Sequence, residues 1–139
     1  MLDNDLIQGA IVDKAQGFSA ITSQLPSGTY SIKEFNWKGV DFQYPCIRVA
    51  LESQIDLSET NVACPSQIDW SFYIFSEKSS SKEANSISGD VVSAFRGLSF
   101  RQNSIKFVKV RVLESIPAVA EDERTWRAQV RCQSIIHSG

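Results

Sequence analysis

Alternating apolar and polar side chains mark the last quarter of the chain as a pair of long strands. Between residues 124 and 136, every second side chain belongs to a mostly apolar set, and those between them are polar. The apolar set is Trp126, Ala128, Val130, Cys132, Ser134 and Ile136, and the polar set is Arg127, Gln129, Arg131 and Gln133. A period of two is typical of a strand that buries one face. We therefore predict a hairpin of residues 104–114 and 124–136, with one face in a core and the polar face available to another molecule.

Three further strands are predicted upstream of this hairpin. The same alternation covers residues 29–37, 44–51 and 67–76. The third of these segments has apolar side chains on both faces: Ile68, Trp70, Phe72 and Ile74 on one, and Tyr73 and Phe75 on the other. A strand that is apolar on both sides is expected in the centre of a sheet.

Apolar residues at intervals of three or four predict two helices. The first covers residues 4–24, with Asp3 as its N-cap, and the second begins near residue 81 and ends at Gly97. Helices and strands in this order form an α+β fold when the helices cover the apolar side of the sheet. We predict a single domain over residues 1–139, with a twisted, mainly antiparallel sheet of about five strands and two helices packed on one face.

Two segments between the strands are predicted to be loops that contact other molecules. One is the polar stretch 53–65, and the other is 116–123, which ends in three acidic residues. Long loops in compact folds are usually functional or mobile.

The composition limits the kinds of partner that the protein is expected to bind. The chain has 139 residues, 42% of them hydrophobic, which is enough for one core without disulfides or metals. Its formal net charge is −2, so the overall charge favours neither free nucleic acid nor an anionic membrane. No apolar run approaches the roughly 18 residues that cross a bilayer. We expect a protein that is made in the cytoplasm and has no membrane partner.

Residues suited to catalysis or metal binding are scarce. His137 is the only histidine and lies close to the C-terminus, and Cys46, Cys64 and Cys132 show neither a C-x-x-C motif nor ligand spacing with it. Glycine-rich phosphate-binding motifs are absent. We expect no enzymatic activity, no cofactor and no metal. The catalytic alternative is a nucleophile and base pair of Cys46 and His137, which requires the fold to bring the two together.

Charged and aromatic side chains near the predicted loops and on the last strand are candidates for an interface. Aromatic side chains at a loop edge can anchor a contact, and complementary charge sets its register. For the acids at 121–123 the alternative is a hydrated hairpin loop. For the arginines at 127 and 131 the alternatives are a solvated face, a surface along a DNA passage, or a match for an acidic partner. The candidates are Trp37, Asp56, Glu59, Glu121, Glu123, Arg124, Trp126, Arg127 and Arg131.

Three segments, taken in order, resemble the tail terminator (tail completion) proteins of long-tailed bacteriophages. They are Y-P-C-I-R-V at 44–49, I-D-W-S-F-Y-I-F-S-E at 68–77 leading into a helix, and E-R-T-W-R-A-Q-V-R at 123–131. The family has a Y-P-x-I-x-V strand, then a strand that ends in a polar turn, a helix, and a last strand carrying an aromatic residue with arginines. The resemblance covers most of the chain after the first helix.

The resemblance implies a non-enzymatic virion subunit at the junction of tail and neck. Such a protein forms a ring, in this family a hexamer, that caps the head-proximal end of the tail tube and joins the tail to the head connector. A ring needs two dissimilar contact surfaces on each subunit, and the 53–65 and 116–123 segments are candidates for them. Its implied partners are other copies of itself, the tail tube protein, the neck proteins and the tail sheath, and DNA passes through the lumen only as cargo.

Two other interpretations stay open at this point. One is another neck component, such as a head completion or stopper protein. The other is a small cytoplasmic enzyme or ligand-binding domain with its site under the 53–65 segment.

Overall fold

The computed structural model describes residues 2–35, 43–57 and 65–138, which form an α+β fold as predicted. The elements are α1 (Asn4–Gln16), α2 (Ser19–Thr22), the 3₁₀ turn η1 (Gly28–Ser31), β1 (Ile32–Glu34), β2 (Cys46–Asp56), β3 (Ser66–Ser76), α3 (Lys82–Phe95), β4 (Phe100–Gln102), β5 (Ile105–Ala120) and β6 (Trp126–Ser138). The described strands make one twisted sheet with the order β1-β2-β3-β6-β5-β4. Only the short β1 runs parallel to its neighbour among these strands, and the other pairs are antiparallel.

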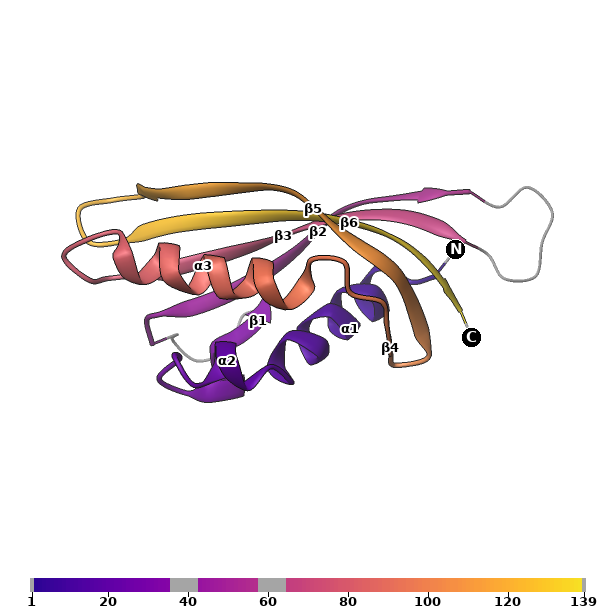
Figure 1. Ribbon diagram of the computed structural model, residues 1–139, viewed down its shortest axis with the longest axis horizontal. Coiled ribbons are helices and arrows are strands. Elements are labelled where there is room, and N and C mark those ends of the chain that lie inside the picture. Colours follow the sequence, from indigo (N-terminus) through magenta and orange to yellow (C-terminus); the bar gives the residue numbers. More distant parts are fainter. Residues whose placement is uncertain (1, 36–42, 58–64, 139) are drawn as a thin grey trace.

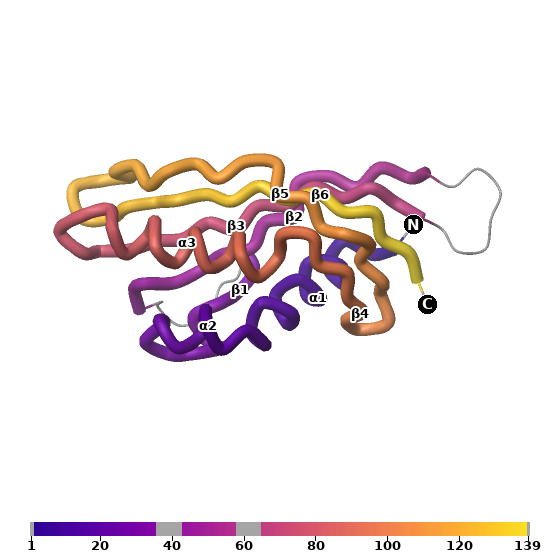
Figure 2. The backbone as a smooth tube through the Cα atoms, viewed as in Figure 1, coloured from indigo at the N-terminus to yellow at the C-terminus, as the bar shows by residue number. Residues whose placement is uncertain are grey.

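The helices lie on one side of the sheet (Figure 1). Helix α1 packs against β1, β2 and β4, whereas α3 packs against β3, β5 and β6. The backbone trace shows α1 and α3 on the same side of the strands (Figure 2), and the short α2 contacts both of them. The opposite side of the sheet has no helix over it in the described part of the chain, and we refer to it as the open face.

The core lies between the sheet and the helices and is rich in aromatic rings. Phe72 of β3 contacts Phe95 of α3 with their ring centroids 4.8 Å apart, and Phe100 stacks on Phe107 at 4.4 Å. Trp70 is completely buried, as its alternation with apolar neighbours predicted. Burial of these rings and of isoleucines such as Ile7 and Ile74 supplies the hydrophobic stabilisation of the core.

The first predicted helix is two helices in the structure. The apolar stripe is correct, because Ile7, Ile11 and Ile21 are all buried. Continuity from residue 4 to 24 is wrong, because α1 ends at Gln16 with Gly17 as its C-cap, and Phe18 has an extended backbone. The extended backbone at Phe18 redirects the chain, and α2 then packs against α1 and α3 with Ile21 buried. The N-cap prediction is confirmed: the Asp3 carboxylate accepts a hydrogen bond from the Asp5 backbone N–H at 2.8 Å.

Both predicted loops are shorter than expected because the flanking strands are longer. Strand β2 continues to Asp56, so residues 53–56 pair with β3 and are not loop. Strand β5 continues to Ala120, so most of 116–123 is strand as well. The strand partners supply backbone hydrogen bonds that the side-chain pattern does not report, and bulges at Leu51/Ser53 and Ile116/Val119 break the alternation.

The sheet has one strand more than the five expected. Strand β4 forms a tight hairpin with β5, in which Asn103 and Ser104 both have positive φ (53° and 63°). Two consecutive residues with positive φ are typical of a type I′ turn. At the other edge, the strand predicted for 29–37 is in part the turn η1, and residues 32–34 form β1; residues 36 and 37 lie outside the described residues.

Candidate functional site

Strands β3 and β6 present a row of polar side chains on the open face. The confirmed alternation of β6 turns Arg127, Gln129, Arg131 and Gln133 away from the core, while Ala128, Val130 and Cys132 are buried. The register places these side chains beside those of β3 in the pairs Asp69↔Gln133, Ser71↔Arg131, Tyr73↔Gln129 and Phe75↔Arg127. The polar face is therefore a continuous surface and not a set of separate side chains.

Hydrogen bonds between side chains cross this surface from strand to strand. Ser71 is completely buried, and its hydroxyl donates to Glu52 Oε1 of β2 at 2.7 Å and accepts from Gln129 Nε2 of β6 at 3.0 Å. Nearby, Gln133 Nε2 donates to Asp69 Oδ1 at 3.0 Å. These bonds fix the side chains in place without a covering layer.

The two arginines that β6 presents on the open face are paired with acids of the same chain. Arg131 donates to Glu114 Oε1 at 2.6 Å, and this hydrogen bond raises the pKa of its guanidinium. Arg127 forms an ion pair with Glu121 at 3.2 Å and lies over the Tyr73 ring at 5.6 Å. The pairing favours the solvated, charge-balanced interpretation of this surface over a basic strip for DNA.

The turn between β5 and β6 forms a cleft with the turn after β3. The indole Nε1 of Trp126 donates to the Lys78 carbonyl at 3.1 Å. Asp122 Oδ1 accepts from the backbone N–H groups of Arg124 (2.8 Å) and Thr125 (2.9 Å), and these bonds lower the pKa of the carboxyl group. The cleft has a volume of about 320 Å³, and Glu123 also lines it.

The predicted interface residues fall into separate places. Those at 121, 123, 124, 126 and 127 cluster at the β5–β6 turn, as the sequence suggested, and Arg131 lies near the middle of β6. Asp56 is exposed at the opposite end of the sheet, where β2 ends. Trp37 and Glu59 lie outside the described residues, as does Cys64.

An aromatic cavity at the start of β2 was not predicted. It has a volume of about 230 Å³ and is lined by Phe35, Tyr44, Cys46, Arg48 and Phe75. Arg48 donates to the Phe35 carbonyl at 2.8 Å, which holds the end of β1 against β2. Burial raises the pKa of Tyr44. No local pattern reveals this cavity, because its walls come from β2 and the segment just before it, from β3 and from the residue that follows β1, which meet only in the folded sheet.

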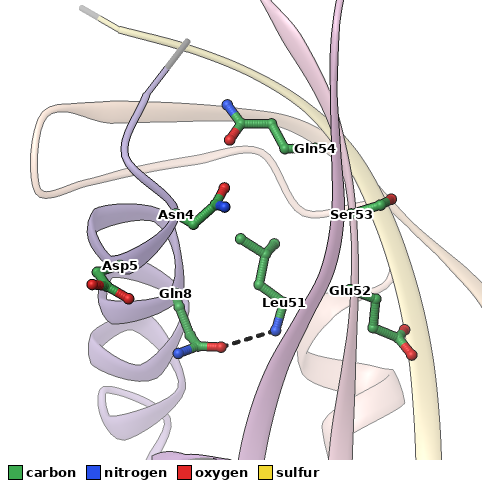
Figure 3. A pocket seen from close by; sticks show the side chains of 7 residues that line it. All are labelled: Asn4, Asp5, Gln8, Leu51, Glu52, Ser53 and Gln54. Carbon is green, nitrogen blue, oxygen red and sulfur yellow. Dashed lines mark hydrogen bonds between the residues drawn. The ribbon is translucent and has the colours of Figure 1, made fainter.

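A polar pocket lies between α1 and the far end of β2 (Figure 3). Within it, Gln8 Oε1 accepts from the Leu51 backbone N–H at 3.0 Å, as the dashed line shows. This bond satisfies a donor on the edge of β2 beyond the end of β1 and fastens the helix to the strand. The pocket has a volume of about 170 Å³, and its lining is Asn4, Asp5, Gln8, Leu51, Glu52, Ser53 and Gln54.

The catalytic alternative fails on geometry and on ionisation. Cys46 pairs with Phe75, which pairs with Arg127, whereas His137 lies about 33 Å further along β6 at roughly 3.3 Å per residue. Burial raises the pKa of Cys46 and of Cys132 to about 12, so both thiols stay neutral at ordinary pH. Among the described residues, no three His, Cys, Asp or Glu side chains gather as a metal site, and no helix has the length and apolar character of a membrane span.

Comparison with known proteins gives similarity in structure only. No protein-family model and no curated protein matches the sequence. The fold is similar to that of a chain in the virion of a native gene transfer agent particle, with a TM-score of 0.70 and 13% identity over 95% of each chain. A second solved structure is similar over 100% of this chain and over 97% of its own length, with a TM-score of 0.61 and 14% identity. Identities this low establish the fold and nothing further.

Proposed function

We propose that the chain is a structural, non-enzymatic subunit of a phage-like virion. The observation that carries the proposal is the fold, which over nearly its full length is similar to that of a gene transfer agent virion chain. The open face gives such a subunit an ordered surface for neighbours, since its side chains are held by hydrogen bonds within the chain.

Within the virion, we propose a role as tail terminator. The single domain would form a homohexameric ring that caps the head-proximal end of the tail tube and joins the tail to the neck. The three segments that resemble the terminator family support this, because they fall on β2, on β3 and at the start of β6, which are neighbours in the sheet. The partners would be other copies of the chain, the tail tube protein, the neck or connector proteins and the tail sheath.

In this role DNA passes through the ring as cargo. The internal pairing of Arg127 with Glu121 and of Arg131 with Glu114 supports a lumen that does not hold DNA tightly. Binding to duplex DNA depends on unpaired cations that neutralise phosphates. The same pairs would present charge of both signs to a protein neighbour.

Mass measurement in solution and electron microscopy, with and without tail tubes, test the proposal. We expect the purified chain to form rings of about six copies and to bind one end of the tubes. A ring of clearly different size that binds connector and not tube would instead indicate a head completion or stopper protein. A strictly monomeric chain at high concentration that leaves tail tubes unchanged would contradict both roles.

A further inference from the structure

The two ends of β2 carry surfaces of different kinds. The first residues of β2 line the aromatic cavity, which is concave. The last residues pair with the start of β3 in a hairpin arm, which we define as residues 53–57 and 65–69. The two surfaces lie about 30 Å apart at roughly 3.3 Å per residue. In Figures 1 and 2 the arm points away from α3 at one end of the long axis, and the start of β2 lies toward the other end.

The arm exposes aliphatic side chains on one side. Ile55 is 52% exposed and Leu57 is 45% exposed, and because they are two residues apart they lie on the same side of the strand. The Leu57 backbone N–H donates to the Pro65 carbonyl at 3.0 Å, so the pairing of the arm continues past the end of β2. The charged residues of the arm are Asp56 and Asp69, with no lysine or arginine.

The cavity has the complementary character. Its walls are mostly aromatic, and among the described residues that line it only Arg48 is positively charged. A volume of about 230 Å³ exceeds the roughly 150 Å³ of an apolar cavity that holds a benzene molecule. An aliphatic side chain therefore fits, and an acidic strand beside Arg48 meets charge of opposite sign.

The long edge of the sheet at β5 is poorly suited to pairing with another copy. The backbone of Val110 is already bonded to Gly97 and Leu98, both at 2.8 Å. Further along, Asn85 Oδ1 accepts from the Ala118 N–H at 2.8 Å, and Pro117 has no N–H to donate. Occupied donors, proline and bulges prevent strand addition, so contacts through the ends of the sheet are favoured.

We propose that the hairpin arm of one copy docks in the aromatic cavity of the next copy. Because the two surfaces differ and lie at opposite ends of β2, the contact is heterologous and joins copies head to tail, as a closed ring requires. Ile55 enters the cavity as the anchor, and the acidic arm lies beside Arg48. This inference rests on the proposed function, since it names the contact that builds the ring.

Two variants, tested alone and mixed, examine the contact. Ile55→Asp replaces the apolar anchor of the arm with a charge, and Tyr44→Asp places a charge in the lining of the cavity. We expect each variant alone to associate roughly 30-fold or more weakly than the natural chain, the size of effect seen on loss of a central anchor. An equimolar mixture retains one intact arm and one intact cavity, so we expect a one-to-one dimer and nothing larger by native mass spectrometry and sedimentation.

A matched control is available on α1. Leu6 is 59% exposed and lies outside both surfaces, so Leu6→Asp should assemble like the natural chain. Circular dichroism and thermal melting confirm that each variant folds. Phe35→Asp serves as a second cavity variant if Tyr44→Asp does not fold.

Four outcomes overturn the docking arrangement. They are normal assembly of Ile55→Asp, normal assembly of a folded cavity variant, absence of a dimer in the mixture, and a natural chain that stops at a symmetric dimer. Rings that persist in both variants would leave the tail-terminator role standing and remove only this contact. A natural chain that is monomeric alone and with tail tubes would remove the proposed function itself.

Discussion

The two faces of β3 are held in place by different interactions. On the face toward the helices, Phe72 and its neighbours are completely buried and contact other aromatic rings. On the open face, Ser71 and Asp69 are held by hydrogen bonds to β2 and β6. The covered face thus accounts for the stability of the fold, whereas the open face is ordered before any partner arrives. A surface of that kind loses little conformational entropy on binding.

The largest expected effect is on the covered face. Phe72→Ala removes a ring that packs on Phe95 at 4.8 Å and leaves a cavity, so we expect the free energy of unfolding to fall by about 3–5 kcal/mol. Denaturant unfolding measures this. Tyr73→Ala, one residue away on the open face, is the control and should cost less than half as much. Equal losses from the two variants would show that the faces do not differ in this way.

The second effect concerns buried thiols and alkaline pH. The pKa of Cys132 is raised from 9.0 to about 12 by burial, so above pH 9 the unfolded chain loses a proton that the folded chain keeps. Stability should therefore be fully present below pH 9 and fall as the pH rises toward 12, by up to about 1.4 kcal/mol per pH unit for each such thiol.

Cys132→Val tests this assignment, because valine fills the site without a titrating group. We expect the difference in unfolding midpoint between pH 8 and pH 10.5 to be smaller in the variant than in the natural chain. The remaining dependence of stability on pH comes in part from Cys46, whose pKa is raised in the same way. An unchanged difference in midpoint between the two pH values would mean that Cys132 does not cause the loss of stability.

Much of the covered face could be predicted from the sequence, because burial imposes a period on the chain. The alternation in 67–76 and 124–136 gave the correct faces of β3 and β6 and the central place of β3. Strand β4 was missed because its turn, Asn103-Ser104, lacks the glycine that usually marks two residues of positive φ. The ends of β2 and β5 were missed because bulges at Leu51/Ser53 and Ile116/Val119 break the alternation of side chains there.

The candidate site was only partly predictable. The cluster at the β5–β6 turn is local in sequence, so Glu121, Glu123, Arg124 and Trp126 could be grouped before the structure was known. The bonds of Ser71 to Glu52 and Gln129 join three strands and depend on their register. Register is set by the whole sheet, and a sequence pattern gives only the side of the strand on which each residue lies.

A moderate effect is expected from the hydrogen bonds of the open face. Ser71→Ala removes the hydroxyl that joins Glu52 to Gln129, so we expect the free energy of unfolding to fall by about 1–2 kcal/mol. Chemical unfolding at neutral pH checks this. Ser115→Ala is the control: Ser115 is exposed, its contact with Ser88 is long at 3.4 Å, and its loss should cost less than about 0.5 kcal/mol. Loss of the same size in both would mean that the open face is not ordered by these bonds.

The smallest effect on folding, and the most informative about function, is expected at Arg127. Its ion pair with Glu121 is exposed, and exposed pairs contribute at most about 1 kcal/mol, so Arg127→Ala should fold normally. In a ring, however, the same side chain lies on the open face, where with Glu121 it is proposed to present charge to a protein neighbour, and its loss should weaken assembly and tail joining. Lys106→Ala is the control. Lys106 is a residue of β5 on the same face of the sheet as Arg127 but far from the β5–β6 turn, so its loss should leave assembly and tail joining unchanged. Normal tail lengths and normal joining in Arg127→Ala would show that this end of the open face is merely solvated. An exposed ion pair affects assembly only if a neighbouring subunit contacts it.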